Sequence, residues 1–120
     1  MKLLEVTPIL QVDDIPSTID FYVNALGFTC DNYEPGWGWA SLRRDSITIM
    51  LALPNKHLPY HSSLLTGSLY LRTNDVDGCW HQLKDKTTIV YPLENFEYGM
   101  REFAVSDCNG YILQFGQPLE

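Results

Sequence analysis

A repeated pattern constrains the fold of this chain more than any other feature of its sequence. Residues 10–22 and 71–83 share the same spacing of acidic and apolar residues, with Asp14 in the first segment where Asp75 lies in the second. Each aspartate is a good N-cap, because its carboxylate accepts hydrogen bonds from the first free N–H groups of a helix. The apolar residues that follow recur on one helical face. Each half of the chain is therefore predicted to contain a strand followed by an amphipathic helix.

Three further strands are expected after each helix. The sequence DSITIML (45–51) has the same alternation as NGYILQF (109–115), so that Met50 corresponds to Gln114. The strands predicted after the helices are residues 28–34, 37–44, 46–53, 88–93, 99–106 and 111–117. The fold class is therefore α+β, with two βαβββ modules in a single domain, residues 1–120. Module one is expected over residues 3–53, a connector over 54–66 and module two over 67–117.

The two faces of the predicted strands differ in character. The face toward the helices carries apolar residues such as Val6, Leu10 and Leu113. The opposite face mixes apolar and hydrogen-bonding side chains, including Met50 and Gln114. Ligand pockets are commonly lined by such a mixture. We interpret the mixed face as a binding surface, and a partly solvated sheet face is the alternative interpretation.

Composition and charge exclude several classes of partner. The formal net charge is -7, and the eight Lys and Arg residues form no cluster, which argues against a nucleic-acid partner and against an anionic membrane surface. No apolar run approaches the roughly 20 residues that span a bilayer. The three cysteines are widely spaced and odd in number, so reduced thiols in a cytoplasmic protein are expected.

Several side chains of the mixed face are candidate ligand contacts. Trp37 and Trp39 are two residues apart in a predicted strand, so they are expected on one strand face, either as an aromatic wall for a ligand or in core or dimer packing. Tyr70 and Arg72 alternate with Leu71 and are expected on the same side of the sheet. Arg72 is interpreted as a contact for a ligand anion or as an ion-pair partner of a glutamate.

Polar groups near the end of the chain are further candidates. Met100 and Glu102 share a strand face, and Glu102 is interpreted as a counter-ion, a general base or a surface carboxylate. Gln114 interrupts an apolar strand, so it is either a structural amide or a ligand contact. His57 and His61 are four residues apart with Pro59 between them, which favours a loop over a metal site.

Three segments resemble a known superfamily. They are PILQVDDIPSTIDFYVNALGF (8–28), WASLRRDSITIML (39–51) and FAVSDCNGYILQF (103–115). The chain resembles the glyoxalase/bleomycin-resistance/dioxygenase superfamily, also called the vicinal oxygen chelate fold. The resemblance implies two βαβββ modules that form a cup-shaped mixed sheet with the helices on its outer face. It also implies a homodimer.

The resemblance also bears on metal binding. Metal-dependent members hold a divalent ion with one ligand on each of four strands, and these positions fall on Thr7, Met50, Ser68 and Gln114. Of the four, only Gln114 is a plausible ligand, because such ions prefer imidazoles and carboxylates. No metal, no cofactor and no catalytic residue are therefore expected.

The sequence thus favours metal-free binding, or sequestration, of a small aromatic or amphipathic molecule. The predicted ligand-binding residues are Trp37, Trp39, Met50, Tyr70, Arg72, Met100, Glu102 and Gln114. One alternative is a metal-dependent lyase, isomerase or dioxygenase with non-standard ligands, drawn from Glu5, Glu102 or the histidines of residues 57–61. Another is an interaction module whose open sheet face is a dimer or partner interface.

Overall fold

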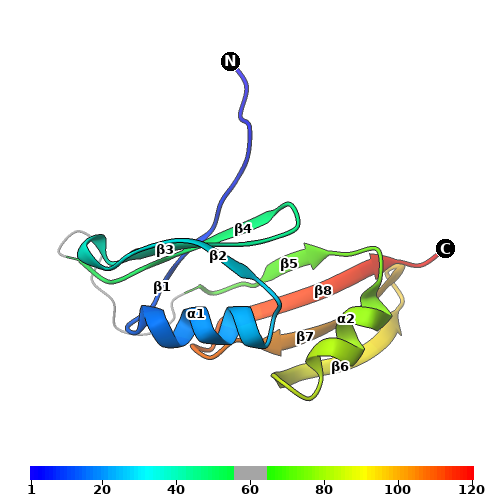
Figure 1. Ribbon diagram of the computed structural model, residues 1–120. Helices are drawn as coiled ribbons and strands as arrows, with labels where there is room; N and C mark the ends of the chain where they lie inside the picture. The colour runs from blue at the N-terminus through cyan, green and yellow to red at the C-terminus, as the bar shows by residue number, and fades with distance from the viewer. Residues whose placement is uncertain (56–64) are drawn as a thin grey trace. The chain divides into compact units, whose positions relative to one another are not determined.

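The computed structural model describes residues 1–55 and 65–120 and divides into two compact units, Met1–Ser63 and Leu64–Glu120. Each unit has one α-helix and one four-stranded sheet (Figure 1). The first unit contains β1 (Ile9–Gln11), α1 (Ile15–Asn24), β2 (Thr29–Glu34), the 3-10 helix η1 (Pro35–Trp37), β3 (Trp39–Arg44) and β4 (Ile47–Ala52). The second contains β5 (Leu69–Arg72), α2 (Val76–Leu83), β6 (Thr88–Phe96), β7 (Met100–Ser106) and β8 (Ile112–Pro118). The predicted α+β fold with two βαβββ modules is confirmed.

The two sheets have the same topology. Their strand orders are β1-β4-β3-β2 and β5-β8-β7-β6, and the first strand of each unit pairs in parallel with the last. The other neighbouring strands are antiparallel, so both sheets are mixed. Met50 lies opposite Ile9 in one parallel pair, and Gln114 lies opposite Tyr70 in the other. The predicted correspondence of Met50 and Gln114 therefore holds in three dimensions.

Both helices begin at the predicted aspartates. A carboxylate oxygen of Asp14 accepts a hydrogen bond from the backbone N–H of Ser17 at 3.0 Å. Asp75 accepts one from the N–H of Gly78 at the same distance. Each aspartate thus satisfies one of the donors that the first turn of a helix leaves free. None of the helices in the described ranges is long and apolar enough to cross a membrane.

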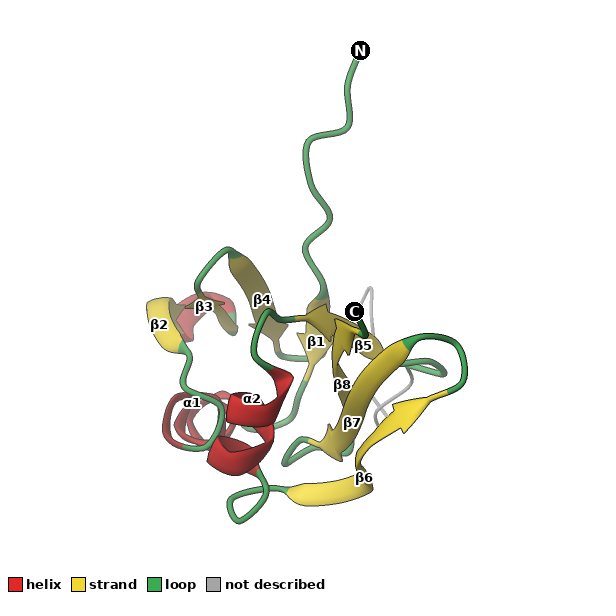
Figure 2. Ribbon diagram, turned by 90° about the vertical axis from the view of Figure 1, so that its right-hand side faces the viewer, coloured by secondary structure: helices red, strands yellow, loops and turns green. Residues whose placement is uncertain are grey.

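In each unit the helix packs on one face of its own sheet (Figure 2). In the first unit Tyr22 of α1 packs edge-to-face against Phe28, with ring centroids 5.4 Å apart. In the second unit Trp80 of α2 packs against Phe103 of β7, which stacks on Phe115 of β8. Because side chains alternate along a strand, Glu102 and Gln114 lie on the face of the second sheet away from α2.

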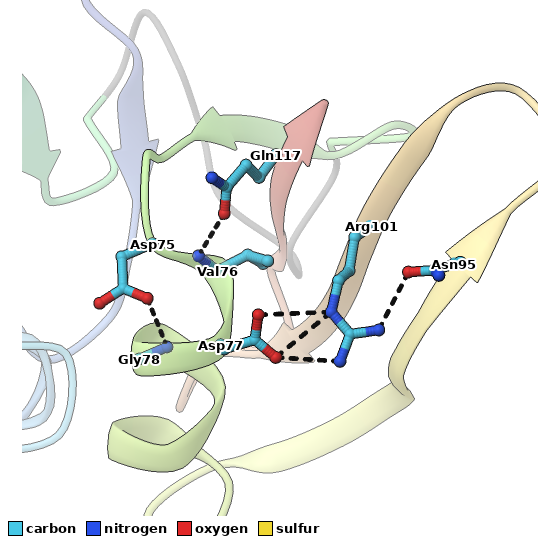
Figure 3. A network of polar contacts seen from close by, with 7 residues as sticks. All are labelled: Asp75, Val76, Asp77, Gly78, Asn95, Arg101 and Gln117. Carbon is cyan, nitrogen blue, oxygen red and sulfur yellow. Dashed lines mark hydrogen bonds and ion pairs between the residues drawn. The ribbon is translucent and has the colours of Figure 1, made fainter. Parts of the chain in front are cut away.

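A polar network ties the start of α2 to three strands (Figure 3). The side-chain oxygen of Gln117 on β8 accepts a hydrogen bond from the N–H of Val76 at 2.9 Å. Arg101 on β7 forms an ion pair with Asp77 at 2.9 Å and donates a hydrogen bond to Asn95 on β6 at 3.0 Å. The interaction with Arg101 lowers the pKa of the Asp77 carboxyl. These contacts fix the helix on its side of the sheet and leave the opposite face to other residues.

Two local predictions are wrong. Val6, predicted to face the core, is 94% exposed, since β1 begins only at Ile9. Pro8 lacks the N–H that would continue the ladder of β1 toward Val6. Trp37 is not in a strand, because Pro35 starts a 3-10 helix that ends at Gly38 with a φ of 62°. Trp37 and Trp39 therefore do not share a strand face.

Other expectations differ from the structure in smaller ways or fall outside it. The strand β6 was predicted to end at residue 93 but continues to Phe96. It is an edge strand, where Pro92 is tolerated because the missing N–H can face solvent. The predicted connector falls largely on residues 56–64, and His57 and His61 lie outside the described residues.

Candidate functional site

Polar and aromatic side chains from all four strands of the second unit meet on the sheet face away from α2. We call Ser68, Tyr70, Tyr91, Glu102 and Gln114 the polar cluster. Gln114 on β8 lies opposite Tyr70 on β5 and Ala104 on β7. Glu102 on β7 lies opposite Gly116 on β8. The cluster is therefore built by strand pairing between segments that are distant in the sequence.

The amide of Gln114 is hydrogen-bonded at both ends. Its side-chain oxygen accepts a hydrogen bond from the hydroxyl of Ser68. Its side-chain nitrogen donates to the hydroxyl of Tyr91 at 2.8 Å. These partners meet the requirement that a half-buried amide be satisfied. They also fix the orientation of the amide, with its oxygen toward β5 and its nitrogen toward β6.

Glu102 is buried without a hydrogen bond. The residue is 1% exposed, and neither oxygen of its carboxyl group has a hydrogen-bond partner among the described residues. The interpretation of Glu102 as a surface carboxylate is therefore wrong. A buried polar group without a partner costs about 1–3 kcal/mol. Such groups are uncommon in native proteins, and they are found at sites that bind or react.

Tyr70 covers the carboxyl group of Glu102. Tyr70 as a residue is 42% exposed, but its hydroxyl end lies over Gly116, where a β-carbon would collide with it. The missing side chain of Gly116 therefore lets the phenol extend across β8 toward Glu102. The pKa of Tyr70 is raised to about 12. Burial of the hydroxyl is the largest cause, and the interaction with Glu102 is the second.

Tyr91 approaches Glu102 from the other edge of the sheet. Burial raises the pKa of Tyr91, and Glu102 raises it further, while the hydrogen bond from Gln114 lowers it. Both phenols are close enough to Glu102 to respond to its charge. Neither is placed to form a hydrogen bond of acceptable distance and angle with it, which leaves the carboxyl oxygens unpartnered.

Arg72 and Met100 lie beside the cluster on the same sheet face. Arg72 is exposed, lies opposite Gly116, and lowers the pKa of Tyr70 through its charge. In the part of the chain that the structure describes, it forms no ion pair with Glu102. Met100 is half-buried at the start of β7. The structure thus brings Tyr70, Glu102 and Gln114 together and places the other two predicted residues at one end of the cluster.

The remaining predicted residues belong to the first unit. Trp39 on β3 lies opposite Ala52, and Met50 on β4 lies opposite Ser41. Trp39 and Met50 are both half-buried on the sheet face opposite the buried Leu42. Trp37 is 76% exposed in η1. The first unit therefore brings two of its three candidates to one sheet face.

The residues present do not fit the divalent metal that the resemblance implies. Ser68 and Gln114 are hydrogen-bonded to each other, and Thr7 and Met50 of the first unit supply only a hydroxyl and a thioether. Imidazole and carboxylate ligands are missing from this set. In addition, the described ranges contain no group of three or more His, Cys, Asp or Glu side chains that could hold a metal ion.

Sequence reasoning missed two members of the site. Tyr91 lies on a strand with register shifts on both sides of it, so simple alternation does not predict its face. Gly116 contributes by having no side chain. A glycine inside a strand often marks a close approach of another group, and this is the feature that could have indicated the position of Tyr70.

Comparison with known proteins places the chain in a family. A model of the Glyoxalase/Bleomycin resistance protein/Dioxygenase superfamily matches residues 2–115. The uncharacterized protein Mb0911c of Mycobacterium bovis is 32% identical over 125 residues, which cover 94% of this chain and 82% of that protein.

Solved structures show the same fold. The crystal structure of TioX from Micromonospora sp. ML1 has a TM-score of 0.79 at 22% identity and covers 97% of this chain and 99% of TioX. The bleomycin-binding protein of Streptomyces verticillus, complexed with copper(II)-bleomycin, has a TM-score of 0.72 at 24% identity and covers 96% of both chains. The chain belongs to the Glyoxalase/Bleomycin resistance protein/Dioxygenase superfamily.

Proposed function

We propose that the protein binds a small aromatic or amphipathic molecule and sequesters it without a metal or cofactor. The polar cluster carries this proposal. It combines an amide of fixed orientation with the partly exposed Tyr70 on a sheet face that α2 does not cover. Apolar surface with a few fixed polar groups is what small-molecule sites require. The bleomycin-binding protein among the structural neighbours supports the same class of function.

The proposal includes the assembly and location of the protein. We propose a homodimer in the cytoplasm that has no nucleic-acid or membrane partner. The acidic balance of the chain supports the exclusion of polyanionic partners. Apolar side chains before β1 support the dimer, since Met1, Leu3, Leu4 and Val6 are exposed to solvent.

Two substitutions test the proposed binding surface. Native mass spectrometry of gently purified protein first asks whether an organic molecule accompanies the chain. Isothermal titration calorimetry with 1-naphthylmethanol as the probe then compares wild type with Gln114→Ala and Tyr70→Ala. We expect each substitution to weaken binding by roughly 5–10-fold, about the effect of one lost hydrogen bond or aromatic contact.

The control is Gln82→Ala, which removes the same kind of side chain from the exposed part of α2. Circular dichroism and thermal melting establish that each variant is folded. If Gln114→Ala and Tyr70→Ala are folded and bind the probe as tightly as wild type, the proposed binding surface is wrong.

A further inference from the structure

Glu102 is the feature of the second unit that the proposed function leaves unexplained. Its carboxyl group is buried, and both oxygens lack a hydrogen-bond partner among the described residues. We infer that the ligand carries a cationic nitrogen, such as an alkylammonium group, and that this nitrogen pairs with Glu102. The inference rests on the proposed function and adds the charge of the ligand to it.

The groups around Glu102 do not supply the missing partner. Tyr70 and Tyr91 lie near it, but neither hydroxyl meets the distance and angle of a hydrogen bond to the Glu102 oxygens. The Gln114 amide forms hydrogen bonds with Ser68 and Tyr91 and none with Glu102. The carboxyl oxygens therefore remain available to a donor from outside the unit.

The charged neighbours of Glu102 favour a cation over an anion. Glu94 on β6 lies directly opposite Glu102 on β7, so two acidic residues are adjacent in the sheet. Arg72 is the nearby cation, but Gly116 lies between it and Glu102 in the strand register. Ammonium N–H groups form shorter and stronger hydrogen bonds with a carboxylate than neutral donors do. Aromatic rings beside the site add further attraction for a cation.

Tyr70 controls access to the carboxyl group. Its hydroxyl lies over Gly116, immediately beside Glu102, while the residue as a whole is 42% exposed. Exposed side chains change rotamer within nanoseconds, so the phenol can swing outward without a change in the backbone. A ligand nitrogen would then take the place that the Tyr70 hydroxyl occupies in the free protein.

Three probes with one ring system and different charges test the inference. Calorimetry at about 0.15 M salt, where distant charges are screened, compares 1-naphthylmethylammonium, 1-naphthylmethanol and 1-naphthylacetate. We expect wild type to bind the ammonium probe at least about tenfold more tightly than the alcohol and to bind the acetate most weakly. Glu102→Gln should reduce the preference for the ammonium probe over the alcohol to less than about threefold.

The matched control is Glu97→Gln. It removes one negative charge from the exposed turn between β6 and β7 and therefore reproduces the change in net charge that Glu102→Gln causes. We expect this variant to keep the preference for the ammonium probe. Thermal melting gives a second readout: Glu102→Gln should melt at the same temperature as wild type or higher, because the free protein loses an unpartnered buried acid.

The outcomes separate this inference from the proposed function. Equal binding of all three probes by wild type would overturn the inference alone, and this result does not require any variant to fold. A preference for the ammonium probe that survives in Glu102→Gln would also overturn the inference. So would a Glu102→Gln variant that melts several degrees below wild type and keeps the preference. If wild type binds none of the three probes at a probe concentration of about 5 mM, any dissociation constant is weaker than that of an ordinary small-ligand site. The proposed function then fails, and the inference fails with it.

Discussion

The Tyr70 hydroxyl gives the stability of the protein a dependence on alkaline pH. Its pKa is raised from 10.0 to about 12 by burial and by Glu102. The native state therefore keeps this proton at pH values where the unfolded chain loses it. The resulting stabilisation is complete below pH 10 and is lost as the pH rises from 10 toward 12.

We predict that Tyr70→Phe flattens this dependence. Urea denaturation should show that the free energy of unfolding falls more steeply between pH 9 and pH 11 in wild type than in the variant. Because Tyr70 is 42% exposed, solvent screening reduces the size of the difference but leaves its direction unchanged. Tyr98→Phe, on an exposed tyrosine next to β7, should behave like wild type. Equal pH slopes in wild type and Tyr70→Phe would contradict the prediction.

Strand alternation predicts which face a side chain occupies but not how it is paired. The sequence places Glu102 and Gln114 on one face of the sheet, and the structure agrees. It does not show that Gln114 is satisfied by Ser68 and Tyr91 while Glu102 has no partner. The partners of Gln114 are 46 and 23 residues away in the sequence, and strand pairing brings each to it. Such a contact has no local pattern in the sequence.

The position of α2 depends on Gln117, which connects the last strand to the first turn of the helix (Figure 3). Its oxygen accepts from the N–H of Val76 at 2.9 Å, and its nitrogen donates to the carbonyl of Asn74 at 3.0 Å. We predict that Gln117→Leu lowers the free energy of unfolding by roughly 1–2 kcal/mol, because a donor of the first turn loses its partner.

Gln117→Glu separates the two hydrogen bonds of this side chain. A carboxylate still accepts from Val76 and adds a negative charge near the helix N-terminus, which favours the helix, but it cannot donate to Asn74. We therefore expect a smaller loss than for Gln117→Leu when both are measured by urea denaturation. Equal losses in the two variants would show that the contact with Val76 does not contribute to the stability of α2.

Helices and strands were largely predictable because each has its own local pattern. Asp14 and Asp75 mark the starts of the two helices, and both cap them in the structure. The failures fall where one residue type interrupts a strand pattern. Pro8 delays β1, and Pro35 starts a 3-10 helix that separates Trp37 from Trp39. In both cases the fixed φ and the missing N–H of proline override the apolar alternation of its neighbours.

The duplication of the βαβββ module and the family were predictable because the same pattern recurs along the chain. Assembly was not predictable from the residues in this way, and the dimer was expected only from the resemblance. An interface depends on which apolar side chains remain exposed after folding, and this is known only once the strands are placed. The exposure of the segment before β1 is an example, since the sequence predicted that Val6 would be buried.

The exposed segment before β1 supplies the prediction for the assembly. Figure 1 shows it as an extended chain, and its apolar side chains Leu3, Leu4 and Val6 are 88–95% exposed. Complete burial of an aliphatic side chain is worth about 1.5–3 kcal/mol, so covering these residues with a second copy would favour a dimer. We predict a dimer mass by native mass spectrometry and by light scattering at micromolar concentration.

Replacing Leu3, Leu4 and Val6 together by serine should weaken the dimer at least about tenfold, because part of the apolar surface available for association is removed. The matched control replaces Lys2 and Glu5 by serine, which alters the same segment without changing its apolar residues. We expect this control to remain dimeric. A monomeric wild type would refute the homodimer, whereas a triple variant that dimerises as tightly as wild type would place the interface elsewhere on the protein.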